Sequence, residues 1–188
     1  MVDETAKNNF ETATDGVQAY HNYFGTPTHD DRIWFELLKV GVFQVGLSWK
    51  VAASKIPVLR QQMAGMVIDQ VAQFDEMDVE RLQKEPDMIR NTRKIRATIQ
   101  NARAIQAIQT EYGSFSAYLW VFVDGQPQLL DSQMAGVSDK SAPISTQLAK
   151  ELKKHQFKFL GPELTHLYML AGGLIQINDQ DYSLKAKP

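Results

Sequence analysis

A long amphipathic repeat over residues 92–112 limits the chain to folds that contain a packed helix. Its apolar side chains recur at the helical spacings of three and four residues, namely Ile95, Ile99, Ala102, Ile105, Ile108 and Tyr112. Residues 33–45 are apolar nearly all round, with Glu36, Lys39 and Gln44 as exceptions, which predicts a buried central helix. Strand-like alternation is nearly absent, so the sequence predicts an all-α fold.

The remaining elements follow from caps and breaks in the chain. Asp30 or Asp31 is suited to cap the central helix, and a new helix is expected at Trp49, after a break at 46–48. Residues 115–123 fit helix or strand by period alone, and 124–144 form the longest expected loop. The first 15 residues are expected to be mobile or loosely docked. Further helices are expected within 67–86 (two short ones), 145–154 and 162–172.

Composition excludes several kinds of chemistry. The 188 residues contain no cysteine, which rules out disulfides, a cysteine nucleophile and a thiolate zinc or iron–sulfur site. The four histidines show no tight ligand spacing, so no metal site is expected. Length favours one domain, and neither a signal peptide nor a run of about 18 apolar residues is present. We therefore expect a cytoplasmic protein without a membrane segment, and a monomer by default.

Basic residues are concentrated in residues 88–110, which contain no acid although the chain has a net charge of −2. The basic residues at the start of this segment are Arg90, Arg93, Lys94 and Arg96. Such a cluster at the start of a helix is suited to bind phosphate, because the backbone N–H groups there also favour an anion. A solvated helix face explains the same composition, and the residues alone do not decide between the two.

Aromatic residues gather at 20–24 and again between Trp34 and Trp49. They are suited either to stack on a planar base or to pack in the core. We expect Trp34 and Phe35 in the core, whereas Trp49 stands at a helix start and is less clearly a core residue. His21 is more typical of a hydrogen-bonded structural residue than of a ligand.

The tight turn at Gly46-Leu47-Ser48 presents an apolar side chain. A leucine on such a turn is suited to wedge between base pairs. A helix break with a partly buried leucine is an equally good explanation.

In their order and spacing these segments resemble the DNA-3-methyladenine glycosylase I family, a group of helix-hairpin-helix DNA glycosylases. The resemblance runs from residue 19 to residue 174. It is carried by AYH (19–21), WFELL (34–38), QVGLSW (44–49), DVERL (78–82), IRNTRKIRATIQNARA (89–104), YLWVFVDGQPQ (118–128), ELKKHQFKFLGP (151–162) and AGGL (171–174).

The resemblance implies a single all-α domain over 1–188 with two lobes, a hairpin and following helix at 88–104, and DNA held across a cleft. The target nucleotide would leave the base stack and enter a pocket. Roles are implied for three groups of residues. Base binding falls on Trp49, Tyr20, Gly41, Phe43 and Gln44, the DNA wedge on Gly46 and Leu47, and phosphate binding on Arg90, Arg93, Lys94 and Arg96.

Two departures from the family pattern are visible. The family places a glutamate eight residues before its tryptophan, where this chain has Gly41, so the catalytic group is unassigned. Glu36 lies five positions away, about 140° round the helix, and does not replace it. The family also holds zinc with two cysteines and two histidines, of which only His21 has a counterpart. We therefore expect no zinc and no other cofactor.

The resemblance implies base-excision repair, namely hydrolysis of the N-glycosidic bond of 3-methyladenine in alkylated double-stranded DNA. Because 3-methyladenine is already cationic in DNA, it leaves without protonation, and a missing carboxylate need not abolish the reaction. Two alternatives stay open: an inactive homologue that binds damaged or distorted DNA, and a glycosylase of altered base specificity.

Overall fold

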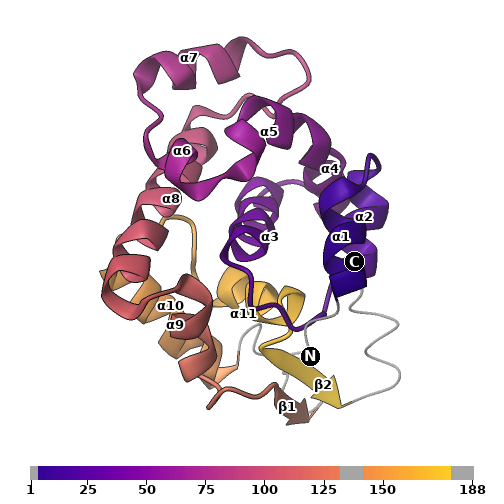
Figure 1. The fold of residues 1–188 in the computed structure, drawn as a ribbon, viewed down its shortest axis with the longest axis vertical. Helices are drawn as coiled ribbons and strands as arrows, with labels where there is room; N and C mark the ends of the chain where they lie inside the picture. The colour runs from indigo at the N-terminus through magenta and orange to yellow at the C-terminus, as the bar shows by residue number, and fades with distance from the viewer. Residues whose placement is uncertain (1–3, 132–141, 179–188) are drawn as a thin grey trace.

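The computed structural model describes residues 4–131 and 142–178 as helices arranged around α3, with one small sheet (Figure 1). In chain order the elements are α1 (Glu4–Thr12), α2 (Gly16–Tyr23), α3 (Asp31–Gln44), α4 (Trp49–Ser54), α5 (Ile56–Gln62), the 3-10 helix η1 (Ala64–Met66), α6 (Ile68–Ala72), α7 (Glu76–Lys84), α8 (Thr92–Tyr112), α9 (Phe115–Val121), β1 (Gln128–Asp131), α10 (Pro143–Lys154), α11 (Pro162–Ala171) and β2 (Ile175–Asn178).

The fold is almost entirely helical, as the periodicity predicted, and the helices form two groups, as the family resemblance implied. In Figure 1, α4–α7 gather above α3, whereas α9–α11 and the sheet lie below it, and α8 runs along one side. β1 and β2 pair in parallel, with Gln128 opposite Ile175. Among the described residues, no helix is long and apolar enough to cross a bilayer.

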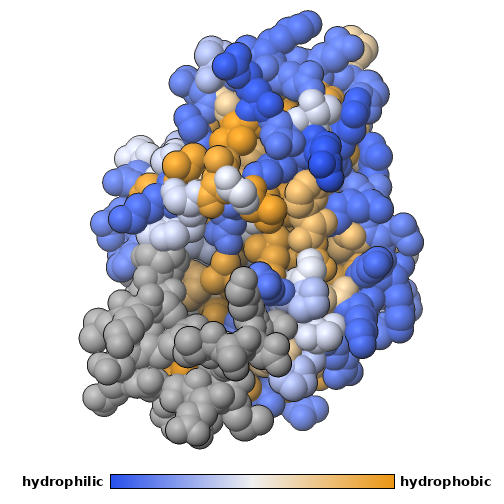
Figure 2. All heavy atoms as spheres, turned by 180° about the vertical axis from the view of Figure 1, so that it is seen from behind, coloured by the Kyte–Doolittle hydropathy of each residue, from blue (hydrophilic) through white to orange (hydrophobic). Residues whose placement is uncertain are grey.

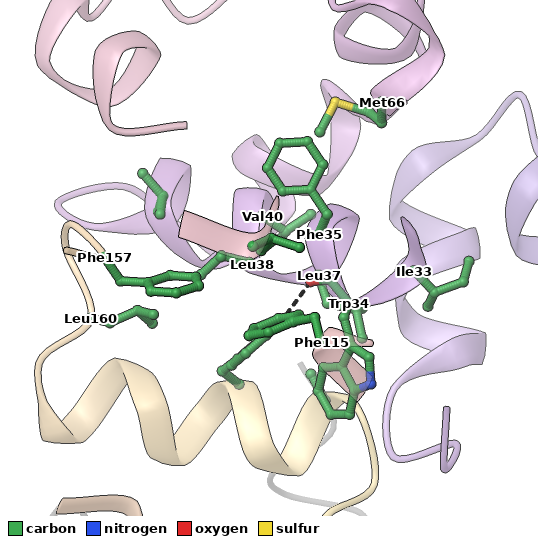
Figure 3. Packing of buried hydrophobic residues seen from close by; sticks show 14 of the residues in the cluster. Ile33, Trp34, Phe35, Leu37, Leu38, Val40, Met66, Phe115, Phe157 and Leu160 are labelled. Atoms are coloured by element: carbon green, nitrogen blue, oxygen red, sulfur yellow. Dashed lines mark hydrogen bonds between the residues drawn. The ribbon is translucent and has the colours of Figure 1, made fainter. Parts of the chain in front are cut away.

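The centre of the core is α3, and its local sequence explains its position. Asp30 caps it by accepting hydrogen bonds from the backbone N–H groups of Arg32 and Ile33. Every residue from Ile33 to Phe43 is buried, which confirms the predicted central helix. Figure 3 shows its apolar side chains meeting residues from distant segments, including Phe115, Phe157 and Leu160.

Close packing fixes α11 against α3. A Cβ on Gly172, just after α11, would lie 2.0 Å from the ring of Trp34, so only glycine fits there. The Trp34 ring nitrogen donates to the Thr28 carbonyl at 3.1 Å, and the Tyr168 hydroxyl donates to the Trp34 carbonyl at 2.9 Å. Trp34 is thus a core residue, as predicted.

Most expected elements are present, and the differences have local causes. Helix α8 spans the residues of the predicted apolar repeat, and residues 115–121 form the helix α9. The prediction of a loose segment over residues 1–15 is wrong for 4–15, because α1 buries Phe10 to 1% exposure. Helix α10 begins two residues earlier than expected, at Pro143. The expected loop 124–144 contains β1, and its residues 132–141 lie outside the described part.

Candidate functional site

An aromatic pair joins α2 to α4. The ring centroids of Tyr20 and Trp49 lie 6.0 Å apart with an interplanar angle of 32°. Tyr20 is buried, which raises its pKa well above the usual value and keeps the hydroxyl neutral. Trp49 is only half-buried, and the ammonium of Lys50 lies 5.7 Å from its ring centroid. The structure therefore brings together the two aromatic residues to which the family pattern assigns base binding.

Trp49 owes its position to a sharp turn between α3 and α4. Ser48 caps α4 by accepting a hydrogen bond from the Val51 N–H at 3.3 Å. Gly46 has a φ of +76°, which glycine adopts more readily than other residues. The side chain of Leu47 on this turn is 46% exposed. An exposed leucine on a tight turn next to a half-exposed tryptophan has the placement that a wedge requires.

Hydrophobic side chains are also exposed on either side of Leu47. Val45 is 44% exposed and Val51 is 43% exposed. Figure 2 shows hydrophobic residues gathered in the middle of the face opposite to that of Figure 1, framed by polar side chains. Apolar groups that remain open to water in this way commonly mark a binding surface.

The other three residues expected to bind a base lie on α3. Phe43 is fully buried, and the buried side-chain oxygen of Gln44 has no hydrogen-bond partner among the described residues. Gly41 is buried as well, and a Cβ there would lie 3.1 Å from Cδ1 of Leu164 on α11. Leu164 thus occupies the space that a longer side chain at position 41 would need.

Lys94 was expected to contact DNA, and this prediction is wrong. The side chain is 5% exposed, and its ammonium donates to the carbonyl oxygens of Phe43 at 2.7 Å and Val45 at 2.6 Å. Burial lowers the pKa of Lys94. Lys94 therefore ties the start of α8 to the end of α3, next to the Gly46 turn, and is not available to a phosphate.

The three arginines of the same cluster are exposed. Arg90 lies in the connection between α7 and α8, and Arg93 lies in the first turn of α8. Neither forms an ion pair among residues 4–131 and 142–178. Arg96 pairs with Glu76 through two contacts of 3.1 and 2.5 Å. Arg90 and Arg93 are consequently better placed than Arg96 to receive a phosphate.

A cluster of buried charged residues on and beside α3 was not predicted from the sequence. Glu36 is fully buried and accepts from Nε of Arg60 at 2.9 Å, while Arg32 approaches it at 3.5 Å. Lys39 is also fully buried, and its ammonium has no hydrogen-bond partner among the described residues. Burial lowers the pKa of Lys39 to about 8. With both oxygens of Glu36 engaged by Arg60, this carboxylate does not replace the one missing at Gly41.

The described residues do not fit a zinc site of the family type. No three of the residue types His, Cys, Asp and Glu come together as possible ligands within 4–131 and 142–178. His21 lies in the last turn of α2, and the chain has no cysteine to complete a thiolate site. No step of the mechanism is therefore assigned to a metal.

Comparison with solved structures defines the class, which is that of the helical DNA glycosylases. A crystal structure of 3-methyladenine DNA glycosylase I aligns with a TM-score of 0.78 at 38% identity, over 89% of this chain and 92% of that chain. The Staphylococcus aureus enzyme, in a study of 3-methyladenine recognition, aligns with a TM-score of 0.77 at 28% identity, over 94% and 90% of the two chains.

The sequence comparisons identify the family. A family model described as methyladenine glycosylase matches residues 10–182. DNA-3-methyladenine glycosylase 1 of Escherichia coli (strain K12) is 35% identical over 158 residues, which are 84% of each chain. The chain therefore belongs to the methyladenine glycosylase family.

Proposed function

We propose that the protein hydrolyses the N-glycosidic bond of 3-methyladenine in alkylated double-stranded DNA, as a base-excision repair enzyme. Family membership over residues 10–182 supports the reaction. The observation that carries it at the site is the pairing of Trp49 with Tyr20 at 6.0 Å, directly after the Gly46 turn that exposes Leu47. One turn thus supplies both a wedge for the base stack and an aromatic face for the base.

The chemistry of the substrate suits this site. An aromatic face attracts a cation through its quadrupole, and 3-methyladenine bears a positive charge while it is still attached to the sugar. Because that charge already makes the base a good leaving group, binding of the flipped nucleotide does most of the catalytic work. The half-exposed face of Trp49 is the surface we assign to the base.

The absence of a carboxylate at position 41 bears on selectivity. A neutral purine requires an acid to protonate it as it leaves, and Glu36 is held by Arg60 and Arg32 away from such a role. Release of 3-methyladenine is therefore expected to exceed release of neutral bases by a wide margin. For 3-methyladenine itself, a buried donor on the base that lacks its acceptor costs about 1–3 kcal/mol. Its release is therefore expected to be about one to two decades slower than with a carboxylate at position 41.

Within this proposal the protein acts as a monomer in the cytoplasm and holds no metal. The support for the last point is the donor set, since the chain has no cysteine and no cluster of metal-ligating side chains forms in the described ranges. Phosphates of the duplex are assigned to Arg90 and Arg93, which are exposed.

The test is incubation of methylated DNA with the protein, followed by chromatographic measurement of the free bases. We expect 3-methyladenine above the spontaneous level. Trp49→Ala should lower its release about one to two decades, because stacking on an aromatic ring is worth about 1–3 kcal/mol per base. Tyr112→Ala is the matched control, since Tyr112 is 46% exposed and lies at the far end of α8.

Leu164 leaves little space at Gly41, where the family has a glutamate, so two other functions are tested in the same experiment. If the protein binds lesion-containing DNA tightly but releases nothing above the spontaneous level, it is a binding protein for distorted DNA. If another modified base is released in preference to 3-methyladenine, the altered surroundings of position 41 have changed its specificity. Equal release by wild type and Trp49→Ala contradicts the assignment of Trp49.

A further inference from the structure

Helices α1, α2 and α4 gather on one side of α3 and lead to the candidate site (Figure 1). Helix α2 carries Tyr20 and α4 begins with Trp49, whereas no residue of α1 belongs to the site described above. The family model matches residues 10–182, so residues 4–9 of α1 precede the matched range. The family match therefore does not account for this helix, and its own contacts indicate what it does.

Helix α2 packs directly on the backbone of α4. A Cβ on Gly16, the first residue of α2, would lie 2.1 Å from the carbonyl oxygen of Ala53 on α4, so only glycine fits there. One turn further along α2, the buried ring of Tyr20 lies 6.0 Å from that of Trp49. Because the two helices are in contact, a shift of α2 changes the position of Tyr20 relative to Trp49.

The other side of α2 is supported by one aromatic contact with α1. Tyr23 lies three residues after Tyr20, so the two side chains are neighbours on the helix surface. The ring of Tyr23 lies 4.9 Å from that of Phe10 on α1, and both rings are buried. Beside this contact the two helices enclose a hollow of about 400 Å³. The support that α1 gives to α2 is therefore concentrated at Phe10.

Phe10 is fixed in turn by Arg60 of α5. The guanidinium lies 5.0 Å from the centroid of the Phe10 ring, and its Nη2 donates to the Phe10 carbonyl at 2.9 Å. A cation stabilises the carbonyl end of a helix, and this carbonyl belongs to the last turn of α1. The Nε of Arg60 is held by the buried carboxylate of Glu36 at 2.9 Å. The buried charge on α3 is thus connected through Arg60 to Phe10.

Two ion pairs set the orientation of α1. Lys7 pairs with Asp30 at 2.7 Å, and Glu11 pairs with Arg32 at 2.9 Å. Lys7 and Glu11 are four residues apart and therefore lie on one face of the helix, and both partners lie at the start of α3. A partly exposed ion pair contributes little to stability. Two pairs on one face nevertheless determine which side of α1 turns toward α3, and so where Phe10 points.

We propose that Phe10 is a positioning residue, which holds α2 so that the ring of Tyr20 is kept against Trp49, and that Arg60 acts with it by fixing Phe10. This inference rests on the proposed function, because it takes the Tyr20–Trp49 pair as the place where the base binds. His21, the single counterpart of the family's zinc ligands, lies on the same helix, and no metal-binding cluster forms within 4–131 and 142–178. Side chains of α1 and α5 therefore fasten α2 in place of a metal.

The test is a double-mutant cycle on the full chain, followed by the release of 3-methyladenine from methylated DNA. The variants are Phe10→Ala, the milder Phe10→Leu, Tyr20→Leu, and Phe10→Ala combined with Tyr20→Leu. The matched control is Phe115→Ala, since Phe115 is also a fully buried phenylalanine but lies on α9 and stacks on Phe157. Rates are measured at a temperature at which circular dichroism shows every variant to be folded.

Phe10→Ala should lower kcat about tenfold, because a misplacement of about 1 Å in an active site costs up to about 100-fold. KM for the DNA should change less than twofold, and Phe10→Leu should lie between wild type and Phe10→Ala. Phe115→Ala should lower the melting temperature as well but change kcat less than twofold. In the Tyr20→Leu background Phe10→Ala should have no further effect on kcat, since residues that act through one another are not additive.

A purely structural role of Phe10 gives a different result. It would reduce kcat by the same factor in the wild type and in the Tyr20→Leu background, or make Phe10→Ala behave like Phe115→Ala, and either outcome overturns the proposal. A second measurement tests the replacement of the metal. Neither a chelator nor added zinc should change the melting temperature or kcat, and a zinc-dependent rise in melting temperature that His21→Ala abolishes would show that a metal still fastens α2.

Binding of free 3-methyladenine, measured by calorimetry, separates this inference from the proposed function. If the wild type releases no base but Phe10→Ala weakens binding of the free base about tenfold, and does so only when Tyr20 is present, the positioning role is supported and the glycosylase is refuted. Base release that is equal in Phe10→Ala and Phe115→Ala refutes the positioning role and leaves the glycosylase standing. A wild type that neither binds nor releases 3-methyladenine refutes both.

Discussion

Lys39 should weaken the fold, because its ammonium is fully buried without a hydrogen-bond partner among the described residues. Desolvation is the largest influence on it and lowers its pKa, while Glu36 raises the pKa in part and Arg60 and Arg32 lower it further. The pKa falls from 10.5 to about 8. At about 1.4 kcal/mol per pKa unit, this difference corresponds to about 3 kcal/mol of lost stability at pH 7.

Lys39→Met keeps the length of the side chain and removes the charge. We expect its free energy of unfolding at pH 7 to exceed that of the wild type by about 3 kcal/mol, as for other buried charges replaced by apolar residues. At about 2–4 °C per kcal/mol for a domain of this size, the melting temperature should rise about 6–12 °C. Glu36 keeps its contacts with Arg60 and Arg32, so the substitution leaves no unpaired carboxylate.

The pH dependence identifies the cause. Between pH 8 and 10.5 the unfolded chain holds the Lys39 proton and the folded chain has lost it, so wild-type stability rises with pH through this window. The advantage of Lys39→Met should therefore shrink above pH 8 and vanish near pH 10.5. Urea unfolding at pH 7, 9 and 10.5 measures this, with Lys150→Met on the exposed side of α10 as control. A constant difference across these pH values, or a less stable variant, would refute the reasoning.

Three further predictions follow from the site and the core. Lys94→Met should lower the free energy of unfolding by about 2 kcal/mol, because two carbonyls lose a charged donor. It should also reduce base release without changing the slope of log K against log salt for DNA binding. Arg93→Met should lower that slope by about one. Gly41→Glu alone should cost about 1–3 kcal/mol against Leu164, so the effect of a carboxylate on base release is measured in Gly41→Glu with Leu164→Ala. Burial lowers the pKa of His166, so the wild type should lose stability as the pH falls below about 6.5, and its difference from His166→Gln in urea unfolding should change between pH 7.5 and pH 5 in favour of the variant.

The periodic parts of the fold could be predicted because burial repeats with the helical turn. The apolar repeat of α8 is buried from Ile95 to Ile108, although its last member, Tyr112, is 46% exposed, and the continuous run from Ile33 to Phe43 is buried throughout. Segment α1 was missed, although Ala6, Phe10 and Ala13 have helical spacing and pack on the core. The two strands, four residues each, are too short for any period to reveal them.

For the candidate site, what could be predicted depended on the family pattern and not on periodicity. The family pattern predicts roles for Tyr20, Trp49 and Leu47, and the structure places the rings of the first two 6.0 Å apart. The contacts of Lys94 could not be predicted, because a lysine among arginines looks the same whether it faces solvent or reaches into the end of another helix. The partners of Lys94, Phe43 and Val45, lie about fifty positions earlier in the chain and contribute only backbone oxygens.

The hydrogen bonds of Lys94 explain how the turn between α3 and α4 is held against α8. Lys94 donates to the carbonyls of Phe43 and Val45, which precede Gly46, so the turn that carries Leu47 and the start of α8 are fastened to each other. A DNA glycosylase needs that relation, because the strand must be held while one nucleotide is pushed out. The two neighbouring cations of the basic cluster therefore differ: the side chain of Arg93 is exposed, whereas that of Lys94 fastens the start of α8 to the end of α3.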